Sequence, residues 1–171
     1  ARPSHRVKES VNKLLDKTLT VLGKHIGVEK VTLEKDLDPS SPLVTIQPAK
    51  FQQALVNLIV NAVHALLDVP EDRRLLRLST RIDTDTDMVI VDIKDRGPGI
   101  PPKRLERIFQ PFFTTKGHGT GLGLHITRSV IEEQGGQITV ESTVGEGTTF
   151  SIHLPLARRK SLLDAARIAH E

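Results

Sequence analysis

The feature that most constrains the fold of this chain is a long apolar helix predicted at residues 49–67. Its apolar side chains recur every three or four residues, as on one face of an α-helix: Phe51, Ala54, Leu55, Leu58, Ile59, Ala62, Val63 and Leu66. Val56 and Val60 make the other side apolar too, and Pro48 suits the first turn. A helix this apolar needs a second layer of structure to cover it.

Other short helices and strands surround this segment. Helices are predicted at residues 9–23 and 121–134, with a short helical piece near 103–109. Strands are predicted at residues 27–37, 43–46, 75–83, 87–94, 137–142 and 147–154. Because their order does not follow strict strand–helix–strand alternation, the sequence predicts an α+β fold, a two-layer sandwich of one mixed sheet and one layer of helices.

The composition excludes several classes of protein. The chain has 171 residues, a formal net charge of +3, and no Cys, Tyr or Trp. The absence of cysteine excludes disulfides, thiolate nucleophiles and cysteine-based zinc sites. The even charge balance and the scarcity of aromatic side chains argue against nucleic acid as a partner. No apolar run has the length of a membrane span, and residues 1–10 do not resemble a signal peptide, so we expect no direct membrane contact.

Polar side chains interrupt the apolar helix along one stripe. Asn57, Asn61 and His64 are spaced by four and three residues and so lie on the same side. A buried carboxamide needs hydrogen-bond partners, and its oxygen is a suitable ligand for Mg²⁺. One such Asn would more often be a structural amide, but two in phase, followed by the loops described next, indicate a site. We interpret His64 as a partly exposed helix histidine.

An aspartate ends the strand predicted at residues 87–94, in register with its apolar side chains. Asp95 therefore points toward the core, where a carboxylate needs a donor. The exocyclic amine of adenine is such a donor, whereas guanine presents an oxygen there. Gly97 and Gly99 remove side chains where a base must approach the backbone. Most D-x-G-x-G strings are plain turns, but the preceding strand and the following loop favour a nucleotide site.

A glycine-rich loop leads into the helix predicted at residues 121–134. Gly117, Gly119, Gly121 and Gly123 alternate there, and free backbone N–H groups at a helix N-terminus bind anions. The loop matches neither Walker A nor G-x-G-x-x-G, and the alternative is a generic flexible loop. Before it stand Phe109, Phe112 and Phe113, which we expect to anchor this segment on the core by packing. Lys116 is placed either to meet a terminal phosphate or to remain a solvated lysine.

In this order the motifs resemble the ATP site of the GHKL superfamily, as found in sensor histidine kinases. The helix resembles the N box, DRGPG at 95–99 the G1 box, FQPFFTTK at 109–116 the F box, GHGTGLGL at 117–124 the G2 box, and GEGTTF at 145–150 the last glycine box. The resemblance covers residues 9–156 and is closest to nitrogen-regulation and dicarboxylate-sensor kinases. It implies the two-layer Bergerat fold.

The resemblance also implies ATP and Mg²⁺ as cofactors and assigns roles to residues. Asn61 would bind Mg²⁺, Asp95 would select adenine, and Thr148 would contact the base, often through water. Asn57 stands where hydrolytic relatives carry a water-activating Glu, and an Asn cannot act as a general base, which favours transfer over hydrolysis. The catalytic set would be Asn57, Asn61 and Lys116. The nucleotide-binding set would be Asn61, Asp95, Gly97, Gly99, Ile100, Phe109, Thr115, Lys116, Gly119, Thr120, Gly121, Leu122, Gly123, Leu124 and Thr148.

The resemblance implies the catalytic domain of a histidine protein kinase that passes the γ-phosphoryl group of ATP to a histidine on a separate helical hairpin. His5 alone lies early enough to be that acceptor, and it lacks the adjacent acid and the proline. We therefore expect the hairpin and the response regulator to lie outside this chain, a cytoplasmic location, a parent protein that can be membrane-anchored, and a monomer. We expect residues 1–8 to end a linker and residues 157–171 to form a basic, amphipathic, helical tail.

Two other functions fit the same motifs. One is a GHKL protein-serine kinase of the anti-sigma type, which would differ in its substrate. The other is a nucleotide-sensing interaction module without transfer activity. Asn61, Asp95 and the glycines favour ATP binding, but they do not distinguish transfer from binding alone.

Overall fold

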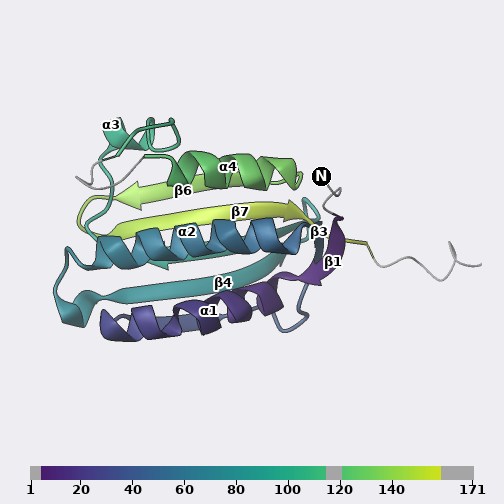
Figure 1. The fold of residues 1–171 in the computed structure, drawn as a ribbon, viewed down its shortest axis with the longest axis horizontal. Helices are drawn as coiled ribbons and strands as arrows, with labels where there is room; N and C mark the ends of the chain where they lie inside the picture. The colour runs from purple at the N-terminus through teal and green to yellow at the C-terminus, as the bar shows by residue number, and fades with distance from the viewer. Residues whose placement is uncertain (1–4, 115–120, 159–171) are drawn as a thin grey trace, which may run out of the picture.

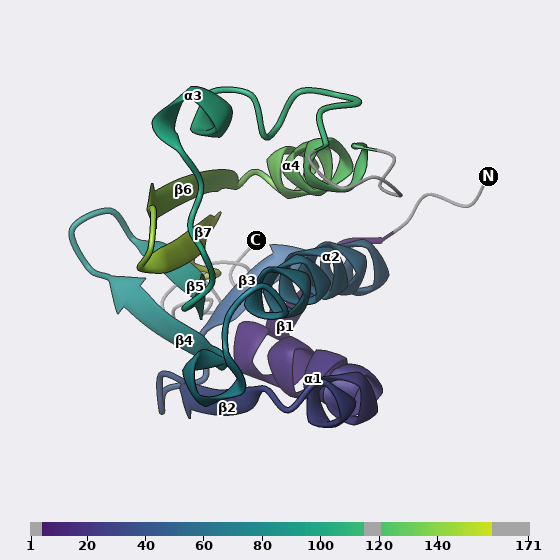
Figure 2. The same ribbon diagram turned by 90° about the vertical axis from the view of Figure 1, so that its left-hand side faces the viewer.

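The computed structural model describes residues 5–114 and 121–158. It has two layers, with a sheet on one side and three helices on the other (Figures 1 and 2). The helices of this layer are α1 (Val11–Val28), α2 (Pro48–Leu66) and α4 (Gly123–Glu133). A short helix, α3 (Pro102–Leu105), and a 3₁₀ turn (Glu71–Arg73) lie in the connections. The α+β sandwich predicted from the sequence is confirmed.

The main sheet has five strands in the order β2-β4-β5-β7-β6. They are β2 (Thr32–Asp36), β4 (Leu75–Asp83), β5 (Met88–Asp95), β6 (Gln137–Thr143) and β7 (Gly147–Pro155). β2 runs parallel to β4, and the other neighbours are antiparallel, so the sheet is mixed as predicted. A separate pair is formed by β1 (Val7–Ser10) and β3 (Leu43–Ile46), and a bridge from Val44 to Leu156 joins that pair to the end of β7.

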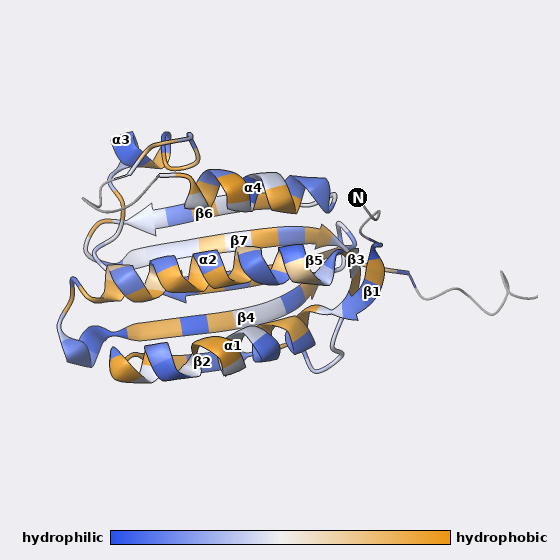
Figure 3. Ribbon diagram, viewed as in Figure 1, coloured by the Kyte–Doolittle hydropathy of each residue, from blue (hydrophilic) through white to orange (hydrophobic). Residues whose placement is uncertain are grey.

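The core lies between the sheet and the helices. Along β4 and β7 buried side chains alternate with more exposed ones, whereas β5 is buried at most of its positions. In Figure 3 apolar and polar residues succeed one another along β4. α2 packs at the centre and buries the apolar residues predicted from its spacing, with Phe51 and Leu55 fully inaccessible. This central position explains why α2 is apolar over so much of its surface.

The N-terminal part of the chain differs from the prediction. The helix expected at residues 9–23 continues to Val28, and the strand expected from residue 27 begins only at Thr32. Gly23 does not end the helix, because Ile26 is buried and anchors a further turn on the core. β1 was not predicted, and it begins two residues before the expected domain boundary at residue 9. The tail from residue 159 lies outside the described residues.

The two ends of the molecule are occupied by different parts of the chain. β1 and the end of β7 lie at one end, and α3 lies at the other (Figure 1). The loop after β5 and the β6–β7 turn lie at the same end as α3. Within the described part of the chain, no helix combines the length and apolar character needed to cross a membrane.

Candidate nucleotide-binding site

A cavity of about 690 Å³ opens at the end of the molecule that carries α3. α2, the loop after β5, α3 and the start of α4 line it, together with β7. Many of the residues predicted from the motifs meet there: Asn61, Asp95, Gly99, Ile100, Gly121, Gly123, Leu124 and Thr148. Asn57, Gly97, Phe109 and Leu122 are described but do not line it. Thr115, Lys116, Gly117, His118, Gly119 and Thr120 lie outside the described residues.

Asp95 is the buried charge of the cavity. It ends β5 opposite Leu76 and Thr148, and it is 3% exposed. The Gly97 N–H donates to its Oδ1 at 2.8 Å, and the Thr148 backbone N–H also bonds the carboxylate. Burial outweighs these bonds and raises the pKa of Asp95 to about 6. At neutral pH the group is therefore a buried anion that a donor such as an exocyclic amine would stabilise.

The glycines after Asp95 serve the packing of the protein itself. A Cβ at Gly97 would lie 2.7 Å from Asp95 Oδ1 and 3.2 Å from the Ala65 Cβ. Gly99 has φ +76°, and a Cβ there would lie 2.3 Å from the backbone oxygen of Thr143 on β6. Gly97 itself does not line the cavity, and its contacts show a role within the protein. The space is needed for the Asp95 carboxylate.

Ser142 was not predicted, yet it connects three parts of the site. Its Oγ accepts from the Ile100 N–H at 2.7 Å and donates to the Gly147 backbone oxygen at 3.0 Å. The Thr148 Oγ1 lies 2.8 Å from the Ser142 Oγ. A serine within a strand carries no motif of its own. The only indication of its role is the pairing of β6 with β7, which places Ser142 directly opposite Thr148.

α2 presents its polar stripe to two different neighbours. Asn61 and His64 line the cavity, as does Asp68 just beyond the end of the helix. Asn57 instead directs its Nδ2 to Thr127 Oγ1 of α4 at 3.4 Å, and Thr127 is fully buried. The predicted stripe is therefore divided between the cavity and the α2–α4 contact.

His64 is exposed, as expected from the sequence. Its ring lies edge-on to that of His25 on α1, with the centroids 6.2 Å apart. The contact joins α1 and α2 beside the cavity.

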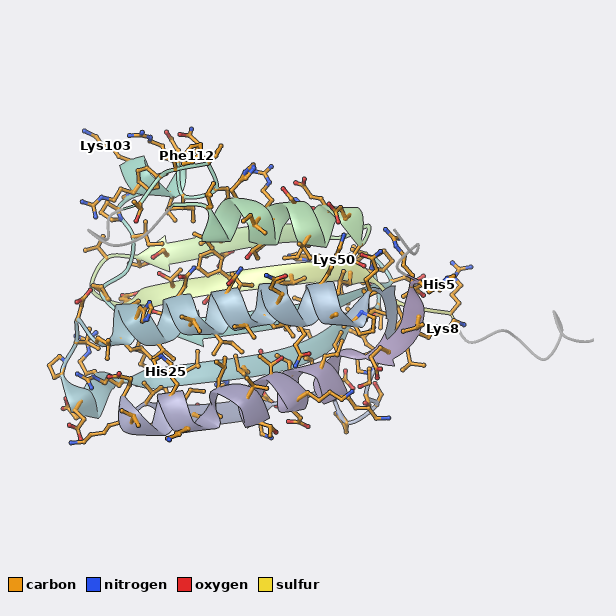
Figure 4. The ribbon with its side chains drawn as sticks, viewed as in Figure 1. His5, Lys8, His25, Lys50, Lys103 and Phe112 are labelled. Carbon is orange, nitrogen blue, oxygen red and sulfur yellow. The ribbon has the colours of Figure 1, made fainter. Side chains whose placement is uncertain are left out.

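The phenylalanines of the loop after α3 behave differently from one another. Phe109 meets Phe150 edge-to-face, with centroids 6.2 Å apart, and Phe113 lines the cavity beneath the Arg107 guanidinium. Phe112 is 74% exposed and lies near α3 at the outer edge of the molecule (Figure 4). The prediction that all three anchor this segment on the core is therefore wrong for Phe112.

The glycine loop approaches the segment before it by backbone contact. Gly121 has φ +71°, and a Cβ there would lie 2.4 Å from the backbone carbon of Phe112. Phe112 itself has φ +66°, a conformation that is strained for a bulky residue. α4 begins at Gly123 on the cavity wall, and among residues 5–114 and 121–158 no side-chain hydrogen bond caps this end of the helix. The N-terminus of a helix favours an anion, so this is the part of the cavity suited to phosphate.

The residues at the cavity fit Mg²⁺ bound together with phosphate. Within residues 5–114 and 121–158, no group of three His, Cys, Asp or Glu side chains could hold a metal ion. Mg²⁺ uses few protein ligands when phosphate oxygens and water complete its shell. The Asn61 carboxamide, on the cavity wall and partly exposed, is the type of ligand that such a shell requires.

Comparisons with known proteins agree with this geometry. Residues 46–158 match the family described as histidine kinase-, DNA gyrase B-, and HSP90-like ATPase. The chain is 34% identical over 151 residues to the sensor protein TdiS of Thauera aromatica, covering 88% of this chain and 28% of that protein. It is 34% identical over 164 residues to the sensory histidine kinase/phosphatase NtrB of Escherichia coli O157:H7, covering 91% of this chain and 46% of that protein. The chain thus spans less than half the length of these relatives.

A solved structure has the same fold. The nucleotide-free catalytic domain of the histidine kinase ThkA superposes with a TM-score of 0.77 at 30% identity, covering 88% of this chain and 95% of that one. The match to a separately solved catalytic domain agrees with the two-layer architecture described above.

Proposed function

Since the chain belongs to the histidine kinase-, DNA gyrase B-, and HSP90-like ATPase family, we propose that it is the ATP-binding catalytic domain of a two-component sensor histidine kinase. It transfers the γ-phosphoryl group of ATP to a histidine on a helical hairpin domain outside this chain. The observation that carries the proposal is one cavity lined by a buried carboxylate, a metal-compatible amide and the N-terminus of a helix.

The adenine end selects the base. The Asp95 carboxylate accepts from the exocyclic amine, and Thr148 lies beside it on β7. Ile100, Ile108 and Phe150 supply apolar surface for the faces of the ring. A purine with a carbonyl at the same position would place an oxygen against the carboxylate and would be rejected.

The phosphate end positions the reacting group. The backbone N–H groups at Gly121, Leu122 and Gly123 would bind phosphate oxygens at the start of α4, and Asn61 would hold Mg²⁺. Mg²⁺ held there would supply positive charge to neutralise the phosphates. Catalysis then consists of holding the γ-phosphate in line with an entering imidazole.

The groups around the phosphate favour transfer over hydrolysis. The position of the hydrolytic general base is Asn57, which cannot accept a proton and whose amide bonds Thr127. The acids among the described lining residues are Asp68 and Asp95, and Asp95 is proposed to bind the adenine ring. In the transfer, the bond from phosphorus to the ADP oxygen breaks, a bond to the imidazole nitrogen forms, and the imidazole proton leaves to a group beside the acceptor. Asn57 and Lys116 remain proposed members of the catalytic set.

The proposal includes partners and a location. The phosphoacceptor hairpin belongs to the same parent protein, and a response regulator receives the phosphoryl group from it. The domain works in the cytoplasm, and we expect it to be a monomer in isolation, with no role for nucleic acid or a direct membrane contact.

The first test is calorimetric titration of the 171-residue chain with ATP and GTP, with and without Mg²⁺. We expect Mg²⁺-dependent binding of ATP that is lost by at least about a hundredfold in Asp95→Asn. Asp92→Asn is the matched control, because Asp92 stands on the same strand but faces away and bonds Arg81 and Ser151. Absence of ATP binding by the folded native chain would overturn the proposal.

The second test is transfer. The chain is mixed with γ-labelled ATP and a histidine-bearing hairpin from a sensor kinase, and acid-labile label on the hairpin is measured. Asn61→Ala should lose transfer by at least about tenfold, whereas Gln53→Ala, an exposed carboxamide of the same helix outside the cavity, should not. ATP binding without transfer to any hairpin would favour a nucleotide-sensing module instead.

A further inference from the structure

We propose that Ser142 is a positioning residue that fixes the direction of the Thr148 hydroxyl hydrogen and so makes Thr148 a hydrogen-bond acceptor toward the base. The inference rests on the proposed function and deepens it, because it assigns part of the selection for an amino-purine to a residue outside the cavity. Ser142 does not line the cavity, whereas Thr148 and Ile100 do. Its effect on a ligand must therefore pass through its neighbours.

The geometry places the two hydroxyls in direct contact. Ser142 and Thr148 are paired across β6 and β7, and their oxygens are 2.8 Å apart. Thr148 is 6% exposed, so bulk water has little access to its hydroxyl in the folded chain. The Gly147 backbone oxygen and the Ile100 N–H complete the surroundings of Ser142 at 3.0 and 2.7 Å.

Counting hydrogens gives one arrangement that satisfies every contact. A serine hydroxyl has one hydrogen and two lone pairs. The Gly147 oxygen can only accept, so the Ser142 hydrogen points to it. The Ile100 N–H can only donate, so it uses one lone pair of Ser142. The Thr148 hydroxyl must then donate its single hydrogen to the remaining lone pair, which leaves only lone pairs of Thr148 for a ligand.

The cavity therefore presents two acceptors at its base-binding end. One is the Asp95 carboxylate, and the other is Thr148 Oγ1, opposite it in the β5–β7 register. An amino group on the base can donate two hydrogens, whereas a purine without that amine would give neither acceptor a donor from the ligand. Ser142 in this arrangement adds to the selectivity without touching the nucleotide.

A purely structural role makes a different prediction. Ser142 also ties the loop after β5 to β6, a link reinforced by the Gly145 N–H bond to the Pro98 oxygen at 2.8 Å. If tying the loop were its whole role, removing the hydroxyl would weaken all purine nucleotides by the same factor. The ratio of two affinities separates the roles, since a common loss cancels.

The probes are ATP and purine riboside 5′-triphosphate, which has a hydrogen in place of the amine and is otherwise identical. Calorimetry on the native 171-residue chain should show a preference for ATP of roughly a hundredfold. Ser142→Ala frees the Thr148 hydroxyl to reorient and should reduce this ratio by about tenfold. Thr148→Val removes the hydroxyl and should reduce the ratio similarly, whereas Thr148→Ser keeps the oxygen and should retain the native ratio.

The double variant completes the test. Because Ser142 acts through Thr148, Ser142→Ala added to Thr148→Val should change the ratio by less than about twofold. An unchanged ratio in Ser142→Ala, additive effects in the double variant, or a native chain that binds ATP without preferring it would overturn the inference and leave ATP binding intact. A native chain that binds neither nucleotide would instead overturn the proposed function. Circular dichroism and thermal midpoints without ligand confirm that each variant is folded.

Discussion

The two ends of the cavity are built in different ways. At the base end, strands β5 and β7 supply side chains that are nearly inaccessible, with Asp95 3% and Thr148 6% exposed, and both are hydrogen-bonded within the protein. At the phosphate end, the described residues offer backbone N–H groups at the start of α4 and a loop whose Phe112 is 74% exposed. The base end thus consists of buried side chains, whereas the phosphate end combines the backbone at the start of α4 with the partly exposed Asn61 carboxamide.

The difference between the two ends follows from the stage at which each polar group needs a hydrogen-bond partner, on folding or on ligand binding. A buried carboxylate or hydroxyl needs its partners as soon as the chain folds, because water cannot reach it. Accessible N–H groups can bond water until a phosphate replaces it. The base end is therefore fixed by folding, and we infer that it supplies selectivity, while the phosphate end supplies affinity for any nucleotide. Substitutions at the base end should affect folding and selectivity, and those at the phosphate end should affect affinity.

The largest expected effect is that of Gly147→Ala, which would disrupt the base end of the cavity by steric overlap. Gly147 has φ +133°, and a Cβ there would lie 2.0 Å from the Asp95 backbone oxygen. Gly147→Ala should lower the free energy of unfolding by more than about 3 kcal/mol, because both the backbone conformation and the contact are unfavourable. Urea denaturation measures this change.

Gly145→Ala is the matched control for that experiment. Gly145 also has a positive φ, +84°, but nothing lies within 4 Å of its added Cβ. It should lower the free energy of unfolding by about 1 kcal/mol, from backbone strain alone. Equal losses in the two variants would show that the close approach to Asp95 does not matter.

The second prediction concerns the buried charge. The pKa of Asp95 is raised from 3.8 to about 6, so its favourable contribution to stability is complete below pH 3.8 and is lost as the pH rises through 6. Above pH 6 the buried anion costs on the order of 3 kcal/mol. Asp95→Asn should therefore raise the ligand-free free energy of unfolding at pH 8 by about 1–2 kcal/mol, less than the full amount because an amide leaves one backbone donor unpaired.

The pH dependence distinguishes this mechanism from a general gain in stability. The advantage of Asp95→Asn should shrink as the pH falls through 6 and should be absent near pH 4, where the native carboxyl is protonated. Denaturation curves at pH 4, 6 and 8 measure it, with Asp92→Asn as the control on the outer face of β5. An advantage that persists unchanged at pH 4 would rule out the buried charge as its cause.

The same contrast separates what the sequence could predict from what it could not. α2 and the β4–β5 hairpin were predicted because helical and strand spacing are local signals. β1 was missed because its four residues, VKES, include a single apolar side chain and take their structure from pairing with β3. The Ser142–Thr148 pair lies within the predicted β6–β7 hairpin, but the strand ranges alone do not fix which residues stand opposite each other, and neither serine nor threonine carries a motif that marks the pair.

The site residues also divide into those that local motifs predict and those whose contacts depend on the packing of separate elements. The motifs predicted roles for Asp95 and Asn61 from the chemistry of their side chains, and the structure places both at the cavity. They did not indicate that Gly97 makes room for the Asp95 carboxylate, or that Asn57 bonds Thr127 of α4. Those facts depend on how separate elements pack. The predictions for Thr115, Lys116, Gly119 and Thr120 lie outside the described residues.

The third prediction tests the phosphate end. Gly121→Ala places a Cβ 2.4 Å from the Phe112 backbone, and the φ of +71° is unfavourable for alanine. Because Phe112 is exposed, the loop can shift, so we expect a loss of stability of only about 1 kcal/mol. Displacing the start of α4 should weaken ATP and purine riboside 5′-triphosphate alike, by about tenfold. Calorimetry with both nucleotides measures this, and an altered ratio between them would contradict the division of roles between the two ends.

The smallest expected effect concerns Phe112, which occupies a left-handed conformation, φ +66°, with its ring 74% exposed. Glycine adopts that conformation without strain, whereas the ring contributes little burial to lose. Against this gain stands the greater freedom of glycine in the unfolded chain, so Phe112→Gly should raise the free energy of unfolding by only about 0.5 kcal/mol. Lys30→Gly, at an exposed position with φ +53°, is the matched control for relief of strain without loss of a ring. A gain of similar size in both variants would identify the backbone as the source. A loss of more than about 1 kcal/mol in Phe112→Gly alone would show that the ring stabilises the loop, so that Phe112 as well as Asn61 would support the phosphate end through a side chain.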